Sequence, residues 1–491
     1  MRSCGILLHI SSLPSKYGIG SLGQSAYNFI DFLNKSGQSY WQVLPIGATS
    51  FGDSPYQSFS AFAGNPLLID IDLLINDGLL SQEAVDSVDF SNDKTHVDYE
   101  KLFDKKFDLL KNSHINFIAK NDFLAFNEFI KENEFWINDY ALFMALKYHF
   151  NQDCWLDWDD DIRLRKASAI EHYTKLLSSQ IDFWKYIQFI FFAQWKKLTR
   201  YAKSADIKIF GDIPIYVSMD SVDLWANTSL FMLDKEKKPI KVAGCPPDSF
   251  SKTGQLWGNP LYDWEAMEKD DFSWWIKRIK AAADLFDLTR IDHFRGFDSF
   301  YAIAYCNKTA EEGEWLEGPK MKLFNSIKDH LGKVNLVAEN LGFLTDSVLE
   351  LLETTGYPGM NVLEFAFDKE NESNYMPHNY KKESVTYIGT HDNDTCVGYI
   401  KSLDKETLAF ARKYMSLNVF EGYVWGIIRT VYSSVSDLVI VQMQDFLELG
   451  SDARMNIPST IGGNWIWRMK PTDMSDKLAD KINKLAKTYF R

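Results

Sequence analysis

The sequence predicts an α/β fold, a (β/α)8 barrel in one domain that spans residues 1–491. Two observations lead to this prediction. Eight apolar segments have the character of buried strands and alternate with helical segments, as in a closed parallel barrel. Four of the eight segments carry a carboxylate as their last or next-to-last residue, and the active sites of such barrels lie where the strands end and extended loops begin.

The predicted strands are short apolar runs that are bounded by glycine, proline and polar residues. In chain order they are 5–10, 40–46, 207–213, 288–292, 334–340, 361–367, 385–392 and 438–444. A helical segment at 26–35 joins the first two strands, which predicts a parallel crossover.

A large helical insertion is expected after the second strand, at residues 70–203. The pattern there changes to amphipathic helices and the strand series resumes afterwards, so we assign the segment to the same domain. Its aromatic residues recur at helical spacing and are expected to pack in a core. A second insertion, at 244–260, is expected to form a substrate-binding loop.

Composition and charge exclude several classes of function. With 46% apolar residues the chain can bury a large core. A net charge of −14 without a basic stripe argues against a nucleic-acid partner. The five cysteines are scattered and form no Cys-x-x-Cys pair, which argues against a disulfide framework and a thiolate zinc site and indicates a reducing compartment. No apolar run suits a signal peptide or a membrane span, so we expect a cytoplasmic protein without membrane association. We also expect no metal and no other cofactor.

The carboxylates at the predicted strand ends are the candidate catalytic groups. They are Asp212, Asp292, Glu339 and Asp392, on the third, fourth, fifth and seventh strands. Like charges gathered at one level of a barrel destabilise the fold, and functional sites are where such clusters persist. Arg290 lies two residues before Asp292 and shares its strand face, where it can hold that carboxylate ionised.

The spacing of adjacent strands favours a retaining glycosidic mechanism. Neighbouring strands lie about 4.8 Å apart, so Asp292 and Glu339 are expected to form a close pair of the kind, about 5 to 5.5 Å apart, that retaining enzymes use. In this hypothesis Asp292 is the nucleophile and Glu339 the acid and base. Asp392, across the barrel mouth, is expected to bind sugar hydroxyls in the transition state.

Motifs in chain order over nearly the whole sequence are shared with one known family. They are GILLH (5–9), SLP (12–14), YGIG (17–20), SPYQ (54–57), SAFAGNP (60–66), GDIPIYV (211–217), GCPPDSFS (244–251), TGQLWGNP (253–260), RIDHFRG (290–296), AE (338–339) and GTHDNDT (389–395). In these motifs the chain resembles glycoside hydrolase family 77, the 4-α-glucanotransferases of the amylomaltase or disproportionating-enzyme type, which are related to the α-amylases.

The resemblance implies that a segment of an α-1,4-glucan is moved to the 4-hydroxyl of an acceptor glucose or maltooligosaccharide through a covalent glycosyl-aspartate. It implies the roles already argued for Asp292, Glu339 and Asp392. Such glucans are then the expected partners, as donor and as acceptor, and the oligomeric state stays open. Substrate binding is expected at Ser54, Tyr56, Asp212, Asp248, Gln255, Trp257, Asn259, Arg290, His293, His391 and Asn464.

Two positions depart from the usual family pattern. Asn340 follows Glu339 where the family usually has aspartate, and Ser459 stands between Pro458 and Thr460 where it usually has glycine. We expect the first change to alter the hydrogen bonds around Glu339. The second is expected to stiffen the loop before Gly462.

Three alternatives remain open. A metal-dependent hydrolase on the same fold is suggested by His391, Asp392 and Asp394. The first strand, however, offers His9 without a His-x-His pair, and the fifth and sixth strands end without histidine, so the supply of ligands is poor. An α-amylase-like hydrolase would release reducing ends from maltotriose without making longer glucans. A non-catalytic glucan-binding barrel would tolerate Asp292→Asn.

Overall fold

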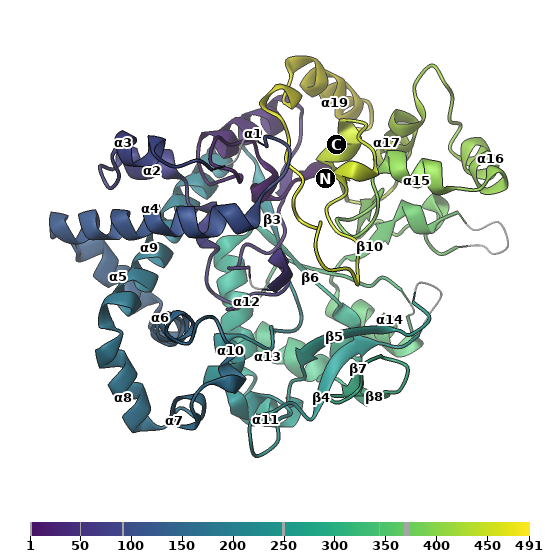
Figure 1. The fold of residues 1–491 in the computed structure, drawn as a ribbon. Helices are drawn as coiled ribbons and strands as arrows, with labels where there is room; N and C mark the ends of the chain where they lie inside the picture. Colours follow the sequence, from purple (N-terminus) through teal and green to yellow (C-terminus); the bar gives the residue numbers. More distant parts are fainter. Residues whose placement is uncertain (1, 50, 91–92, 248–250, 343, 368–372) are drawn as a thin grey trace.

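The computed structural model describes residues 2–49, 51–90, 93–247, 251–342, 344–367 and 373–491, which form a parallel barrel flanked by helices (Figure 1). Within these residues the barrel contains eight strands, and the predicted (β/α)8 class is confirmed. Around the barrel the strands are β10 (Gly359–Val362), β11 (Ser384–Tyr387), β12 (Leu438–Gln442), β1 (Ser3–Leu7), β2 (Tyr40–Gln42), β3 (Lys208–Ile213), β6 (Leu288–Ile291) and β9 (Leu336–Ala338).

The seam between β9 and β10 is joined by a main-chain and a side-chain hydrogen bond. The Ala338 amide donates to the Pro358 carbonyl at 2.9 Å. The Met360 amide donates to Asn340 Oδ1 at 2.6 Å. A side chain thus takes part in closing the barrel directly beside Glu339.

The predicted strands are all present, but several end earlier than the sequence predicts. β1 ends at Leu7, β2 at Gln42, β10 at Val362 and β11 at Tyr387, against predicted ends at 10, 46, 367 and 392. Residues beyond these ends, such as Val43, are still buried. The apolar pattern reports burial, which continues into the loops, whereas the strand ends where its hydrogen-bonded ladder ends.

Most helices outside the β2–β3 connection flank the barrel or its loops (Figure 1). For example, α12 packs against β3 and β6, and α17 against β12. Their bounds are α1 (Gln24–Lys35), α10 (Val222–Ala226), α11 (Trp264–Lys269), α12 (Ser273–Leu285), α13 (Met321–Leu331), α14 (Asp346–Thr355), α15 (Cys396–Ser402), α16 (Lys405–Tyr414), α17 (Tyr423–Ser433), α18 (Met443–Phe446) and α19 (Asp476–Thr488).

The chain between β2 and β3 is a helical region on the left of Figure 1. Its helices are α2 (Ile71–Asn76), α3 (Gln82–Asp86), α4 (Tyr99–Lys120), α5 (Leu124–Glu132), α6 (Glu134–His149), α7 (Asp160–Arg163), α8 (Ala167–Leu176) and α9 (Ser178–Ser204). Helix α9 contacts α1 and β3 of the barrel as well as α4, α5, α6 and α8. Aromatic rings pack throughout the region. The ring centroids of Phe117 and Tyr186, for example, lie 4.8 Å apart. The division into one domain with an inserted helical region stays a prediction.

A four-stranded antiparallel sheet, which was not predicted from the sequence, lies beside the barrel. Its strands are β5 (Gln255–Pro260), β4 (Lys241–Cys245), β7 (Ser299–Ala304) and β8 (Glu314–Glu317), in that order. The segment 244–260, expected to be a loop, therefore begins and ends in paired strands, β4 and β5. Short strands with glycine and proline inside them give a weak sequence signal.

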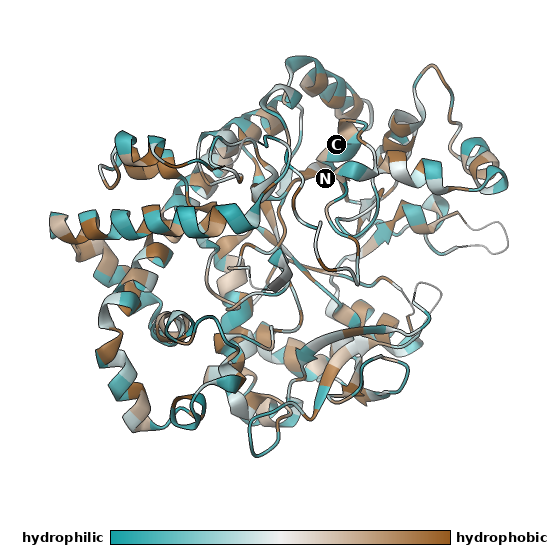
Figure 2. Ribbon diagram, viewed as in Figure 1, coloured by the Kyte–Doolittle hydropathy of each residue, from teal (hydrophilic) through white to brown (hydrophobic). Residues whose placement is uncertain are grey.

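The outer helices are amphipathic and capped by polar side chains. Helix α19 buries Ala479, Ile482 and Ala486, three and four residues apart, which is one helical face, and Figure 2 shows hydrophilic and hydrophobic stretches alternating along it. The side chains of Asp98 and Ser475 accept hydrogen bonds from the first turns of α4 and α19. Such caps satisfy amides that have no partner within the helix.

The five cysteines are free thiols. None of the helices in the described part of the chain combines the length and apolarity that a bilayer crossing requires. The cytoplasmic location stays a prediction.

Candidate active site

Asp292 and Glu339 follow neighbouring strands at the same level of the barrel. In the pairing of β6 with β9, Ile291 lies opposite Ala338, so each acid is the first residue after its strand. The Glu339 amide donates to the Ile291 carbonyl, and the Phe294 amide donates to the Glu339 carbonyl, both at 3.0 Å. The main chain thus fixes the two acids relative to each other.

The Glu339 carboxylate is oriented by backbone amides. The His293 amide donates to Oε2 at 2.7 Å, and the Leu341 amide donates to Oε1 at 2.9 Å. Burial raises the pKa of Glu339 to about 7; Arg290 opposes this rise and Asp292 adds to it. Glu339 can therefore exchange a proton near neutral pH, as a general acid and base must.

Arg290 bridges two carboxylates beneath the site. Its Nη1 donates to Asp212 Oδ2 and its Nη2 to Asp292 Oδ1, each at 2.7 Å. The Arg290 side chain is 5% exposed, that of Asp212 0% and that of Asp292 29%. Burial alone lowers the pKa of Arg290, but the two aspartates outweigh it and hold the pKa well above its ordinary value. The guanidinium is therefore charged and faces Asp292 from inside the barrel.

Asp212 lies deeper than predicted. It is paired with Arg290 across β3 and β6, two residues below Asp292, so the expected ring of four acids at one level is wrong at this position. The Tyr56 hydroxyl donates to Asp212 Oδ2 at 2.9 Å. Burial raises the pKa of Asp212 to about 7, against the opposing effect of Arg290. Asp212 therefore lies below the two acids and accepts hydrogen bonds there from Arg290 and Tyr56.

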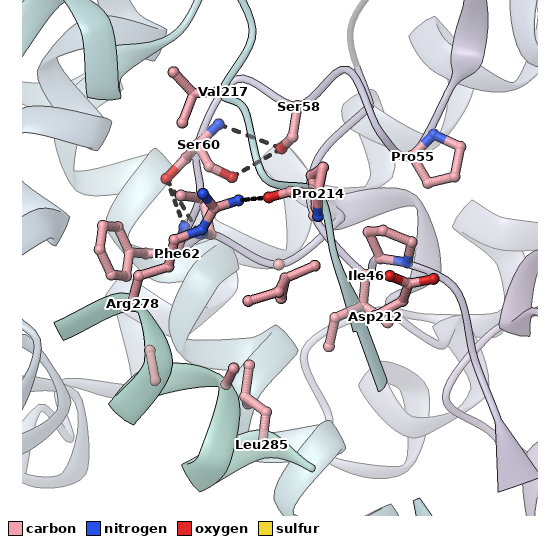
Figure 3. A pocket seen from close by; sticks show the side chains of 18 of the residues that line it. Ile46, Pro55, Ser58, Ser60, Phe62, Asp212, Pro214, Val217, Arg278 and Leu285 are labelled. Carbon is pink, nitrogen blue, oxygen red and sulfur yellow. Dashed lines mark hydrogen bonds between the residues drawn. The ribbon is translucent and has the colours of Figure 1, made fainter. Parts of the chain in front are cut away.

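A cavity of about 70 Å³ lies behind Asp212. Figure 3 shows Asp212 beside Ile46 at one side of this cavity and Arg278, whose guanidinium donates to the Pro214 carbonyl, at the other. Apolar side chains, among them Leu285, line much of the space between them. These surroundings are the physical cause of the raised pKa of Asp212, because a carboxylate is poorly solvated there.

Asp392 lies in a turn beyond β11 and not at the end of a strand. β11 ends at Tyr387, and the Asp392 side chain is 41% exposed. Its Oδ1 accepts a hydrogen bond from Asn456 Nδ2 at 2.6 Å, and its Oδ2 lies 3.4 Å from His391 Nε2. The predicted strand 385–392 is wrong at its end because the Thr390 amide turns back to Asn393 Oδ1, at 2.9 Å.

An aromatic group borders Asp392. The rings of Tyr56 and His391 are stacked, with centroids 5.1 Å apart and planes at 14°. The ring centroid of Trp465 lies 5.9 Å from that of Tyr56 and 5.8 Å from that of His391. Burial lowers the pKa of His391, so this imidazole is neutral at pH 7. The Tyr56 amide donates a hydrogen bond to Ser54 Oγ at 3.3 Å, which stabilises the loop that bears both residues.

A second aromatic contact lies near Asp292. Trp257, on β5, meets His293 edge to face at 4.8 Å, and burial lowers the pKa of His293 to about 4. Gln255 Oε1 accepts from Trp257 Nε1 at 3.2 Å. Asn259 Nδ2 donates to a backbone carbonyl of the β3 loop at 2.8 Å. Asp248 is outside the described residues, and the substrate-binding roles of all these side chains stay predictions.

Asn464 folds its own loop. Its Oδ1 accepts the Ile457 amide at 3.0 Å, and its Nδ2 donates to the carbonyl and hydroxyl of Thr460 at 3.2 and 3.0 Å. Inside this loop Ser459 has φ of 64°, a left-handed conformation that favours glycine. The glycine usual in the resembling family fits this backbone, so Ser459 adds local strain here.

The other departure, Asn340, retains the acceptor that the seam requires. Its Oδ1 takes the Met360 amide, as an aspartate oxygen can equally do. The difference lies in charge, because an aspartate would place a negative group directly after Glu339.

Comparisons with known proteins agree with these motifs. A family model described as 4-alpha-glucanotransferase matches residues 8–474. A 4-alpha-glucanotransferase of Clostridium butyricum is 50% identical over 486 residues, which cover 99% of this chain and 100% of the relative. One from Streptococcus pneumoniae is 49% identical over 492 residues, covering 100% and 97%.

The chain belongs to the 4-α-glucanotransferase family. This membership confirms the enzyme class that the motifs imply. Among solved structures, an amylomaltase from Streptococcus agalactiae in complex with acarbose has a TM-score of 0.98 at 42% identity and is covered over 100% of both chains. An amylomaltase from Corynebacterium glutamicum, with a TM-score of 0.77 at 16% identity, covers 99% of this chain and is covered over 75% of its own length, and shows the fold alone.

Three residues of this 4-α-glucanotransferase that surround Asp392 and its aromatic neighbours were not predicted from the sequence: Arg454, Asn456 and Trp465. The weak signal available was a polar pair flanking Met455 before the Pro458 motif. Within the described residues, no three His, Cys, Asp or Glu side chains are grouped so that they can hold a metal ion.

Proposed function

We propose that this 4-α-glucanotransferase moves a segment of an α-1,4-glucan to the 4-hydroxyl of an acceptor glucose or maltooligosaccharide, with retention and through a covalent glycosyl-Asp292. The pairing of β6 with β9 carries this proposal, because it places Asp292 and Glu339 side by side. Acids on adjacent strands leave little space for a water between carboxylate and sugar, which favours a nucleophile over an activated water.

In the first half-reaction Asp292 attacks the anomeric carbon while Glu339 delivers its proton to the glucosidic oxygen. The bond from Asp292 to the sugar forms, the glucosidic bond breaks, and the shortened glucan leaves with a 4-hydroxyl. The charged Arg290 beside Asp292 supports the nucleophile as a carboxylate. The raised pKa of Glu339, about 7, supports a proton on the acid.

In the second half-reaction the roles reverse. The 4-hydroxyl of the acceptor attacks the anomeric carbon, Glu339 takes its proton, and Asp292 leaves as a carboxylate. Asp392 stabilises both transition states through the sugar hydroxyls. Its partly exposed side chain, near the stacked rings of Tyr56 and His391, supports this role.

Transfer requires that the acceptor sugar outcompetes water for the intermediate. Binding energy that holds the acceptor and excludes solvent achieves this. Trp257 and Tyr56 are suited to it, because aromatic faces cover the apolar faces of glucose rings. The S. agalactiae amylomaltase was solved in complex with acarbose, which supports a sugar-binding role for the matching residues of this chain.

Incubation with maltotriose as the only sugar tests the proposal. Transfer predicts glucose together with a ladder of maltooligosaccharides longer than maltotriose. An α-amylase-like hydrolase, the second candidate, would give glucose and maltose alone, and that product pattern would overturn the proposal. Addition of labelled glucose provides the control, because only transfer incorporates the label into longer chains.

A further inference from the structure

The loop 454–464, which we name the clamp loop, forms two hydrogen bonds with Asp392. Asn456 Nδ2 donates to Asp392 Oδ1 at 2.6 Å, and Arg454 Nη2 donates to the Asp392 carbonyl at 2.6 Å. Arg454 Nε also donates to the Asn456 carbonyl at 2.7 Å. Arg454 therefore ties together the main chains of the acid and of its side-chain partner.

The turn that bears Asp392 has its own internal support. The amide and the hydroxyl of Thr390 donate to Asn393 Oδ1 at 2.9 and 3.0 Å, and the Asp392 amide donates to Thr390 Oγ1 at 3.3 Å. These bonds hold the main chain of the turn without help from Asn456. The Asn456 amide thus acts on the Asp392 carboxylate itself.

The clamp loop is braced at its far end and open on its outer face. Asn464 bonds Ile457 and Thr460 across the loop, as described above, which restricts the backbone next to Asn456. Ile457 and Ile461 are 49% and 79% exposed. The hydrogen bonds of Asn464 therefore restrain the backbone next to Asn456, the residue that faces Asp392.

We propose that Asn456 and Arg454 are positioning residues that aim the Asp392 carboxylate at the donor sugar. Asn456 fixes the carboxylate rotamer through Oδ1, and Oδ2, which His391 Nε2 approaches only to 3.4 Å, keeps lone pairs for sugar hydroxyls. Arg454 fixes the distance between the clamp loop and the turn. This inference rests on the proposed role of Asp392 in stabilising the transition state.

Asn456→Ala and Asn456→Asp test the inference in steady-state disproportionation of maltotriose. Because Asn456 donates to the acid and is proposed to act through it, kcat is expected to fall, on the order of 10- to 100-fold as for a lost hydrogen bond to a charged group, with KM nearly unchanged. The aspartate variant keeps the size of Asn456 but removes the donor, so it carries the test if the alanine variant folds poorly. Asn456→Gln, which retains an amide donor, is expected to recover part of the loss.

Asn483→Ala is the matched control. Asn483 lies on α19, where its amide donates to the Lys35 carbonyl at 2.9 Å, so a similar side-chain bond is lost far from the site. It is expected to leave kcat unchanged. An equal loss of kcat in both variants would overturn the inference.

A double-mutant cycle with Asp392→Ala, measured as fluoride release from α-maltosyl fluoride, separates positioning from a general effect on the fold. If Asn456 acts through Asp392, Asn456→Ala changes the rate of the Asp392→Ala variant less than about threefold. The same large loss in both backgrounds would overturn the inference. A large effect of Asp392→Ala with none of Asn456→Ala would overturn the inference alone, whereas no effect of Asp392→Ala would overturn the proposed role of Asp392 as well.

Discussion

The two sides of the barrel mouth hold their acids by different means. On the β6–β9 side, the main-chain ladder places Asp292 and Glu339, and backbone amides bind the Glu339 carboxylate. On the β11–β12 side, Asp392 lies beyond its strand and is held by side chains of the clamp loop. The first arrangement is fixed with the fold, whereas the second depends on how a loop packs.

The largest loss of activity is expected when either acid on the β6–β9 side, Asp292 or Glu339, is replaced. Asp292→Asn and Glu339→Gln remove the nucleophile and the acid without changing the backbone, so kcat for maltotriose is expected to fall by about 10³-fold or more in each. Product formation measured by chromatography gives the rates, and circular dichroism checks the fold. A variant that kept a tenth of the activity would show that the acid has another role.

The Arg290→Met variant tests how much Arg290 stabilises the β6–β9 side of the barrel mouth. The change leaves Asp212 buried without its cation, so the free energy of unfolding is expected to fall by about 3 to 5 kcal/mol, as measured by urea denaturation. The double variant Arg290→Met with Asp212→Asn should recover part of this loss, because it also removes the unpaired charge. No recovery would mean that the loss comes from packing.

The pH dependence of kcat/KM sharpens the comparison further. Glu339 must be protonated to act as the acid, and its pKa of about 7 predicts that kcat/KM for maltotriose falls above that pH, by about tenfold per unit. With α-maltosyl fluoride the leaving group needs little protonation, so this fall should largely disappear. If it persisted, a group other than Glu339 would control the fall, and Asp212, whose pKa burial also raises to about 7, would be the first to test by substitution.

The smallest effect is expected at the seam beside Glu339. Asn340→Asp keeps the acceptor for the Met360 amide but adds a negative charge. A like charge disfavours ionisation of Glu339, so the fall in kcat/KM should move to higher pH by less than about one unit. A move to lower pH would contradict this electrostatic account. Asn340→Ser, which adds no charge, is the control for altered packing.

The barrel was predictable because buried parallel strands are nearly continuous apolar runs. All residues of β11 and β12 are buried, for example. The strand ends were less predictable, since Val43 stays buried after β2 has ended. The antiparallel sheet was missed because β4 and β5 are short and contain glycine or proline, which weakens the alternating pattern of a strand.

The site divides in the same way. Asp292 and Glu339 were predictable because they directly follow strands and strand neighbours share a level. Asn456, by contrast, lies 64 residues from Asp392 in the chain, and no spacing in the sequence links the two. The depth of Asp212 was missed because its register with Arg290 is set by the tilt of the barrel and not by local pattern.

Trapping the covalent intermediate tests the central claim most directly. In Glu339→Gln with α-maltosyl fluoride, the first step needs little acid but the second lacks its base, so a glycosyl-enzyme should accumulate. Acid quench, peptic digestion and mass spectrometry should then find one maltosyl group on the peptide that contains Asp292, and none in the Asp292→Asn variant. A maltosyl group on another residue, or turnover with inverted products and no adduct, would contradict the account.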